Sequence, residues 1–174
     1  MKCFHKKLNT GFTLIELLVV VAIIGLLATL SIVALNSSRD KAKQAKAASD
    51  MKRVTESMIL AQGETGKTLL EITGNGCSDC ACRGIGSIIN IAAGSSCYGS
   101  WQSAITKIND ACGGVFQGIN RVTRDPWGSP YLLDENEGEG GGCAQDAFRS
   151  AGPDGIHGTV DDLVKVIPHI RCQN

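Results

Sequence analysis

The sequence predicts an α+β fold in which one long N-terminal helix precedes a small antiparallel sheet. Two observations predict the helix: residues 12–35 carry a single charged side chain, and residues 36–61 contain neither proline nor glycine. A third observation predicts the sheet, because short apolar segments near the C-terminus are separated by turn-forming residues. The chain has 174 residues, enough for one globular domain besides such a helix.

The first half of the predicted helix is almost entirely apolar. As a helix, residues 12–35 would span roughly 36 Å, which is long enough to cross a bilayer. Glu16 is the exception, and placing a carboxylate near the bilayer centre costs roughly 2.5–3.5 kcal/mol. If the chain is cut after Gly11, the new amine on Phe12 gives Glu16 a partner, in the same chain or in a neighbouring copy. An uncleaved signal anchor is the alternative, but it leaves Glu16 and the basic leader unexplained.

The second half of the predicted helix is amphipathic. Apolar residues recur at steps of three and four, which places them on one helix face. They are Ala47, Met51, Val54, Met58 and Ala61. Gly63 is the first strong helix breaker, so the helix is predicted to span residues 12–62 and to pack this face against a head formed by residues 63–174. The basic stretch 39–53 is predicted to be a solvated face, because no aromatic residue is interleaved for base stacking.

Eight cysteines in so short a chain indicate an oxidising compartment. All but Cys3 are disulfide candidates: Cys77, Cys80, Cys82, Cys97, Cys112, Cys143 and Cys172. Disulfides that hold a loop-rich insertion are favoured, although the C-x-x-C-x-C cluster at 77–82 is also compatible with a thiolate metal site or a redox pair. Because seven is an odd number, at least one of these sulfurs must stay outside an internal bridge.

The residues around Gly11 resemble a known processing signal. The segment KLNTGFTLIELLVVVAIIG, residues 7–25, resembles the class III signal of type IV pilins and type II secretion pseudopilins. The resemblance implies a pilin-like fold, cleavage between Gly11 and Phe12 by a prepilin peptidase, and N-methylation of Phe12. It also implies that Glu16 pairs with the Phe12 amine of an adjacent subunit and sets the register of a fibre.

Three regions follow from the helix prediction and the resemblance together. Residues 1–11 are the leader peptide, residues 12–62 the long helix with a transmembrane or fibre-core segment at 12–35, and residues 63–174 an extracytoplasmic head. The lysines of the leader place the N-terminus in the cytoplasm by the positive-inside rule. The expected location is therefore the inner membrane, as a single-pass protein with a periplasmic or extracellular head, and then an assembled fibre.

The C-terminal part combines turns with three apolar segments. Strands are predicted at 131–133, around residues 147–148 and at 163–167. The string D-P-W-G-x-P-Y at 125–131 resembles a motif of the type II secretion major pseudopilins, in which Trp127 would anchor the core or the sheet. Two further segments, 85–93 and 101–108, are apolar enough for short elements whose type the sequence leaves open.

An acidic loop lies between the last two predicted strands. Residues 150–162 hold three glycines and three carboxylates, a composition that can gather oxygen ligands for calcium, although the spacing is not that of an EF-hand and alone favours an exposed turn. The loop resembles the calcium loop of major pseudopilins. That resemblance implies calcium ligation by Asp154 and Asp162, with Asp161 as a further candidate, while His157 is expected to face solvent.

No catalytic triad, paired carboxylates or phosphate-binding loop occurs in the sequence, so an enzyme is not expected. The resemblances imply a structural fibre subunit, the major pseudopilin of a type II protein secretion system. The alternatives are a type IV pilus pilin for adhesion, motility or DNA uptake, and a membrane-tethered Cys-rich metal or redox domain. Expected partners are further copies of the chain, prepilin peptidase, the inner-membrane assembly platform, minor pseudopilins or pilins, and membrane lipid.

Nucleic acid is not an expected partner. Cleavage after Gly11 removes Lys2, Lys6 and Lys7, which lowers the 17 basic side chains to 14 against 17 acidic ones. A mature net charge of −3 argues against a chain whose main task is binding nucleic acid.

Overall fold

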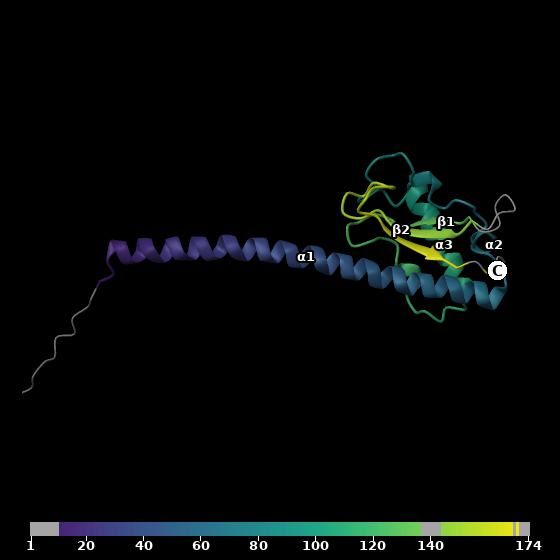
Figure 1. Ribbon diagram of the computed structural model, residues 1–174, viewed down its shortest axis with the longest axis horizontal. Helices are drawn as coiled ribbons and strands as arrows, with labels where there is room; N and C mark the ends of the chain where they lie inside the picture. Colours follow the sequence, from purple (N-terminus) through teal and green to yellow (C-terminus); the bar gives the residue numbers. More distant parts are fainter. Residues whose placement is uncertain (1–10, 137–143, 169, 171–174) are drawn as a thin grey trace, which may run out of the picture. The chain divides into compact units, whose positions relative to one another are not determined.

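The computed structural model describes residues 11–136, 144–168 and 170, and it confirms the predicted α+β, pilin-like fold. The elements are α1 (Leu14–Thr65), α2 (Leu69–Thr73), the 3-10 helix η1 (Cys80–Cys82), α3 (Ser96–Ala111), the 3-10 helix η2 (Ile119–Arg121), β1 (Leu132–Asp134), β2 (Asp146–Ser150) and β3 (Leu163–Ile167) (Figure 1). The chain forms two compact units, one ending at Ala42 and the other beginning at Lys43.

Helix α1 is a single helix of 52 residues that passes the predicted stop at Gly63. A glycine inside a helix costs only about 1 kcal/mol, so Gly63 alone does not end it. The helix ends instead at Gly66, which has a left-handed φ of 65° and donates its N–H to the carbonyl of Gln62 at 2.8 Å. This is a glycine-terminated helix end.

The sequence predicts a transmembrane segment over residues 12–35. In the parts of the chain that the structure describes, no helix combines the length and the apolarity that crossing a membrane requires.

In the unit that begins at Lys43, the later turns of α1 pack against the sheet and α3 (Figure 1). The predicted stripe on this part of α1 is confirmed, since each of its five side chains is at most 1% exposed. The sheet has the order β1-β2-β3 with both pairs antiparallel, and it pairs Leu133 with Phe148 and Phe148 with Lys165. The three predicted strands are therefore present. Basic side chains along 39–53 are exposed, as expected of a solvated face.

An aromatic cluster forms the centre of this core. Trp101 on α3 stacks on Phe148 of β2 with ring centroids 5.2 Å apart, and its edge meets Tyr131 at 5.9 Å. Its indole N–H donates to the carbonyl of Val122 at 2.9 Å, so the buried ring has no unpaired polar group. The expectation that Trp127 is the core anchor is wrong, because Trp127 is only partly buried and lies outside this cluster.

The Cys-rich insertion, residues 74–97, has its own smaller core. Cys82, Ile88 and Cys97 bury themselves there against Leu132 and Ala151. The two apolar segments of undecided type differ in outcome. Residues 101–108 belong to α3, whereas residues 85–93 form turns, and Ser87 there makes an isolated β-bridge with Ile156 of the acidic loop.

Candidate functional site: the N-terminal motif and the acidic loop

The first turn of α1 holds Glu16 in a capping box. Thr13 precedes the helix, and its backbone N–H and hydroxyl both donate to Glu16 Oε2, at 2.9 and 2.7 Å. In return the Glu16 N–H donates to Thr13 Oγ1 at 3.3 Å. This reciprocal pattern satisfies backbone donors that a helix start otherwise leaves free. Glu16 therefore has a local hydrogen-bond partner within its own chain.

This capping role of Glu16 was not predicted, although the sequence carries a signal for it. Thr13-Leu14-Ile15-Glu16 matches the T-x-x-E pattern of a capping box ahead of an apolar run. Gly11 and Phe12 lie just before this cap, and both are exposed. A Cβ built on Gly11 would meet no atom within 4 Å, so the backbone at the expected cleavage point is open to approach.

The three aspartates of the acidic loop converge on one hydroxyl group. Thr159 Oγ1 lies 2.6 Å from an oxygen of Asp161, 3.3 Å from one of Asp154 and 3.4 Å from one of Asp162. A hydroxyl carries a single proton, so it can donate to only one of the three carboxylates. Thr159 is the residue of this cluster that sequence reasoning missed, because neither its type nor its spacing distinguishes it from an ordinary turn residue.

Backbone groups turn the carboxylates inward. The N–H of Ile156 donates to Asp154 at 2.7 Å, that of Asp154 to Asp161 at 3.1 Å, and that of Gly158 to Asp162 at 2.9 Å. Hydrogen bonds from the Thr159 hydroxyl and from the Asp154 N–H lower the pKa of Asp161 below its ordinary value.

The Cys-rich insertion supports the acidic loop from one side. The Ser87 hydroxyl donates to the carbonyl of Asp154, and the Ile88 N–H donates to that of Gly155, both at 2.8 Å. Gly155 has a φ of 66°, and a Cβ there would lie 2.5 Å from Cγ1 of Ile89. Only glycine permits this close packing without displacing the insertion.

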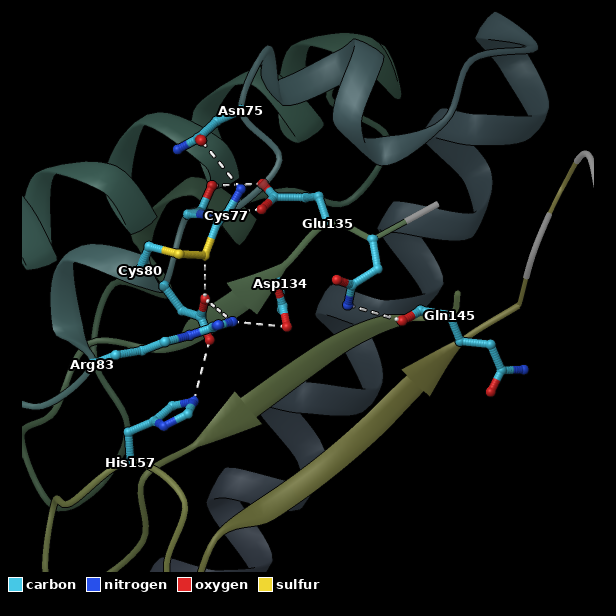
Figure 2. A network of polar contacts seen from close by, with 11 residues as sticks. Asn75, Cys77, Cys80, Arg83, Asp134, Glu135, Gln145 and His157 are labelled. Carbon is cyan, nitrogen blue, oxygen red and sulfur yellow. Dashed lines mark hydrogen bonds and ion pairs between the residues drawn. A yellow bond between two sulfur atoms is a disulfide. The ribbon is translucent and has the colours of Figure 1, made fainter. Parts of the chain in front are cut away.

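His157 joins the two segments, which corrects the expectation that it faces solvent. Its side chain is 20% exposed, and Nε2 lies 3.3 Å from Asp79 Oδ2 in the insertion. Arg83 reaches the same carboxylate at 2.7 Å and also contacts Asp134 at 2.8 Å. Figure 2 shows Arg83 and His157 approaching this carboxylate from two sides, beside the Cys77–Cys80 disulfide.

A second buried carboxylate lies next to this network. Glu135 is fully buried after β1, and Ser78 donates to it twice, from its N–H at 2.8 Å and from its hydroxyl at 2.5 Å. Burial raises the pKa of Glu135 from 4.5 to about 7, because the Ser78 hydrogen bonds only partly offset the loss of hydration.

Asp125 holds the segment D-P-W-G-x-P-Y, residues 125–131, in a turn. One of its oxygens accepts the N–H groups of Trp127, Gly128 and Ser129 at 2.9–3.0 Å. The other accepts the Ser150 hydroxyl at 2.6 Å, which ties this turn to the end of β2. The string is therefore a turn closed by a buried carboxylate, and burial raises the pKa of Asp125.

Four of the candidate cysteines form two disulfides, Cys77–Cys80 and Cys82–Cys97, a pairing that the sequence left open. Cys112 is a buried free thiol, so its candidacy for a disulfide is not supported. Cys143 and Cys172 lie outside the described residues.

Among the described residues, the metal-capable side chains whose ligand atoms lie within 4.8 Å of one another are Cys77, Asp79 and Cys80. The disulfide occupies both sulfurs, so this oxidised pair offers no thiolates to a metal.

The described features define a class of protein: a long helix with an apolar first half, a capped Glu16 close to the N-terminus, and a small antiparallel sheet form a pilin-like subunit. A family model described as "Prokaryotic N-terminal methylation motif" matches residues 6–32. The chain is 30% identical to type II secretion system core protein G of Aeromonas hydrophila over 159 residues, 91% of this chain and 93% of the relative. It is 31% identical to the protein of that name from Escherichia coli strain K12 over 154 residues, 88% of each chain.

A third relative, type II secretion system core protein G of Pectobacterium carotovorum, is 30% identical over 160 residues, 88% of this chain and 81% of the relative. The comparison with solved structures gives no match. These similarities extend along nearly the whole chain. The chain belongs to the family of type II secretion system core protein G.

Proposed function

We propose that this chain is the major pseudopilin of a type II protein secretion system, a structural subunit that polymerises into a fibre. The observation that carries the proposal is the similarity to type II secretion system core protein G over about nine-tenths of the chain, head included. A methylation motif alone would fit pilins of several kinds, but similarity through the head favours the secretion subunit over a type IV pilus pilin.

Processing at the N-terminus is the first step of the proposed function. Prepilin peptidase would cut between Gly11 and Phe12, and the new amine of Phe12 would be methylated, as the motif over residues 6–32 implies. Both residues are exposed, and among the described residues beyond its chain neighbours no atom lies within 4 Å of a Cβ built on Gly11, which supports access by a peptidase.

Glu16 would then exchange its hydrogen bonds with Thr13 for an ion pair with the amine of Phe12 from a neighbouring copy. In the single chain its carboxylate accepts from Thr13. In a fibre, the positively charged amine of Phe12 from a neighbouring copy supplies an opposite charge in apolar surroundings, where an ion pair is much stronger than in water. This pairing sets the register between subunits, because a shift along the helix would leave both charges unpaired.

The apolar first half of α1 also favours a location in the inner membrane before assembly. Large apolar side chains there stand exposed on every side of the helix, including Leu14 (82%), Leu17 (60%) and Leu26 (65%). Such a surface must be covered by lipid or by other copies of the chain. The proposed partners are therefore membrane lipid, further subunits, and the assembly platform and minor pseudopilins of the secretion system.

The acidic loop fits a calcium ion. Three carboxylates surround the one hydroxyl of Thr159, which can donate a proton to only one of them, so the cluster carries excess negative charge that a cation would balance. Carboxylates and neutral oxygens are the ligands that calcium prefers. Asp154, Asp161 and Asp162 would hold the ion, which would neutralise their mutual repulsion and fix the loop against the insertion.

Substitution of Glu16 tests the fibre proposal. We expect Glu16→Ala to abolish fibre formation in cells that carry the secretion system, while the head remains folded, because the α-amine then has no carboxylate to pair with. The measurement is the yield of sheared fibres, with circular dichroism of the purified chain as the check on folding.

A matched variant separates assembly from helix capping. Thr13→Ala removes the two hydrogen bonds that run through the Thr13 hydroxyl, but it keeps the backbone N–H donor and the Glu16 carboxylate, so fibres should still form. If Thr13→Ala and Glu16→Ala abolish fibres equally, Glu16 acts only as a helix cap and the register proposal is wrong.

A further inference from the structure

The two disulfides of the insertion differ sharply in their surroundings. Cys82 and Cys97 are each 1% exposed and belong to the smaller apolar core. Cys80 is exposed and Cys77 is partly so. Thiol–disulfide exchange requires a thiolate to reach a sulfur atom, so only the Cys77–Cys80 pair is open to it in the folded chain.

A buried carboxylate lies against the accessible disulfide. Asp79 stands between the two cysteines in the sequence, its side chain is fully buried, and its Oδ1 lies 3.1 Å from the sulfur of Cys77. Arg83 contacts the same oxygen at 2.7 Å, and His157 approaches the other one (Figure 2). Arg83 thus compensates part of the negative charge that faces Cys77.

The Asp79 carboxylate interacts differently with the disulfide and with the dithiol. In the disulfide, Cys77 carries no proton and offers Asp79 nothing to accept. In the dithiol, the Cys77 S–H can donate to Asp79 Oδ1 at the separation already present, and a hydrogen bond to an ionised acceptor is roughly twice as strong as a neutral one. Asp79 is therefore placed to stabilise the reduced pair.

We propose that Cys77–Cys80 is a reversible thiol–disulfide exchange site, which accepts two electrons from a dithiol carried by a partner protein, and that Asp79 is its positioning residue. Cys82–Cys97 remains oxidised and holds the insertion together throughout. This site is separate from fibre assembly at Glu16 and from the three carboxylates of the acidic loop.

The exchange proceeds in two balanced steps. A thiolate of the partner attacks the exposed sulfur of Cys80, a mixed disulfide forms, and the Cys77–Cys80 bond breaks. The Cys77 sulfur keeps the bonding electron pair, takes a proton from water and donates it in a hydrogen bond to Asp79. The second thiolate of the partner then attacks the partner's own sulfur in the mixed disulfide, so Cys80 leaves as a thiolate, takes a proton from water, and the partner is left as a disulfide.

Selective reduction of the full-length chain in detergent micelles tests the site. Graded dithiothreitol redox buffers are applied without denaturant, free thiols are alkylated, and peptide mass spectrometry measures each cysteine. We expect Cys77 and Cys80 to become alkylated together while Cys82 and Cys97 stay oxidised. Opening of both disulfides at the same dithiothreitol ratio, or opening only after urea is added, would overturn the proposal.

Variants test the role of Asp79. For Asp79→Asn, the equilibrium constant for reduction of Cys77–Cys80 by dithiothreitol should fall about tenfold, because the amide oxygen is a weaker acceptor for the thiol. Asp134→Asn is the matched control, since Asp134 contacts Arg83 but no sulfur. An unchanged constant in Asp79→Asn, or equal falls in both variants, contradicts the positioning role.

Variants in which one cysteine of the pair is replaced by serine identify the attacked sulfur. They do not depend on how well Asp79→Asn folds. In Cys77→Ser, the exposed thiol of Cys80 should form a mixed disulfide with oxidised glutathione. In Cys80→Ser, the half-buried thiol of Cys77 should do so at least severalfold more slowly. If Cys77 reacts as fast as Cys80, the proposed direction of attack is wrong.

Discussion

At the scale of single residues, three buried carboxylates of the head differ in the groups that compensate their charge. Asp125 closes a turn through three backbone N–H groups and the Ser150 hydroxyl. Asp79 sits between Arg83 and His157. Glu135 accepts hydrogen bonds from Ser78 and Thr73 and has no cation among its described contacts, so its charge is the least compensated of the three.

The pKa of Glu135 makes the stability of the head depend on pH. Its folded-state pKa is raised from 4.5 to about 7, so the folded chain binds the proton more tightly than the unfolded chain. The free energy of unfolding should therefore fall as pH rises from 4.5 to about 7, by up to about 3 kcal/mol, and level off above that. Glu135→Gln should remove the part of this slope that Glu135 contributes, as measured by urea unfolding followed by tryptophan fluorescence.

The chain itself provides a control for that experiment. Glu64→Gln removes an exposed carboxylate and should leave the slope as it is in the unsubstituted chain. Equal slopes in Glu135→Gln and in the unsubstituted chain would show that Glu135 does not carry the effect.

Calcium should raise the melting temperature of the chain, and chelation should reverse the rise, because an ion that binds only the folded state stabilises it. At a free concentration 100-fold above the dissociation constant this amounts to about 2.7 kcal/mol. Asp154→Ala should lose the response. Thr159→Ser should keep it and Thr159→Val should weaken it, since serine retains the hydroxyl around which the carboxylates gather.

Differential scanning calorimetry with calcium and with chelator measures these shifts. Asp40→Asn is the control, because Asp40 is an exposed carboxylate on α1 that should not affect calcium binding. A calcium response that survives Asp154→Ala would exclude this loop as the site.

At the scale of elements, the stripe on α1 carries much of the head's stability. Met58 is fully buried in the core cluster, whereas its neighbour Ile59 is 45% exposed. Met58→Ala should lower the free energy of unfolding by roughly 2–5 kcal/mol, the usual range for truncating a buried side chain. Ile59→Ala should cost much less, and urea unfolding of the two variants compares them directly. Equal losses would mean that the stripe does not set the packing face.

The elements also show what a sequence pattern can and cannot predict. Periodicity predicted the buried face of α1 correctly, because a helix repeats its environment every three to four residues. Alternating apolar segments bounded by turns likewise predicted the three strands. The helix end was missed by a few residues, since the left-handed conformation of Gly66, and not the mere presence of Gly63, stops it.

Contacts between distant segments lay beyond prediction from the sequence. Nothing in the spacing of residues 74–97 indicates that Ser87 would pair with Ile156, or that His157 would turn toward Asp79. For the same reason Trp101 rather than Trp127 became the core tryptophan: each is flanked by polar and small residues, and only the packing of α3 on β2 distinguishes them. Only the geometry shows that the Thr159 hydroxyl lies among the three carboxylates of the acidic loop.

At the scale of the whole molecule, the two units differ in how their apolar surface is covered. The unit that begins at Lys43 contains the whole of its core, including the α1 residues from Met51 to Ala61. We expect a chain that begins at Lys43 to fold cooperatively and to show the same urea midpoint as the full-length chain in micelles. A non-cooperative transition, measured by tryptophan fluorescence and circular dichroism, would show that this unit needs the α1 residues that precede Lys43 in order to fold.

The contact of Gly155 with Ile89 has a consequence for how such chains can diverge. The acidic loop and the Cys-rich insertion meet where a single added carbon atom would clash. Alanine at 155 would be strained by its left-handed φ of 66°, and it would also need a smaller residue at 89 or a shifted insertion. We expect the two positions to covary among close relatives that carry the insertion, so that two segments distant in sequence are inherited as a pair.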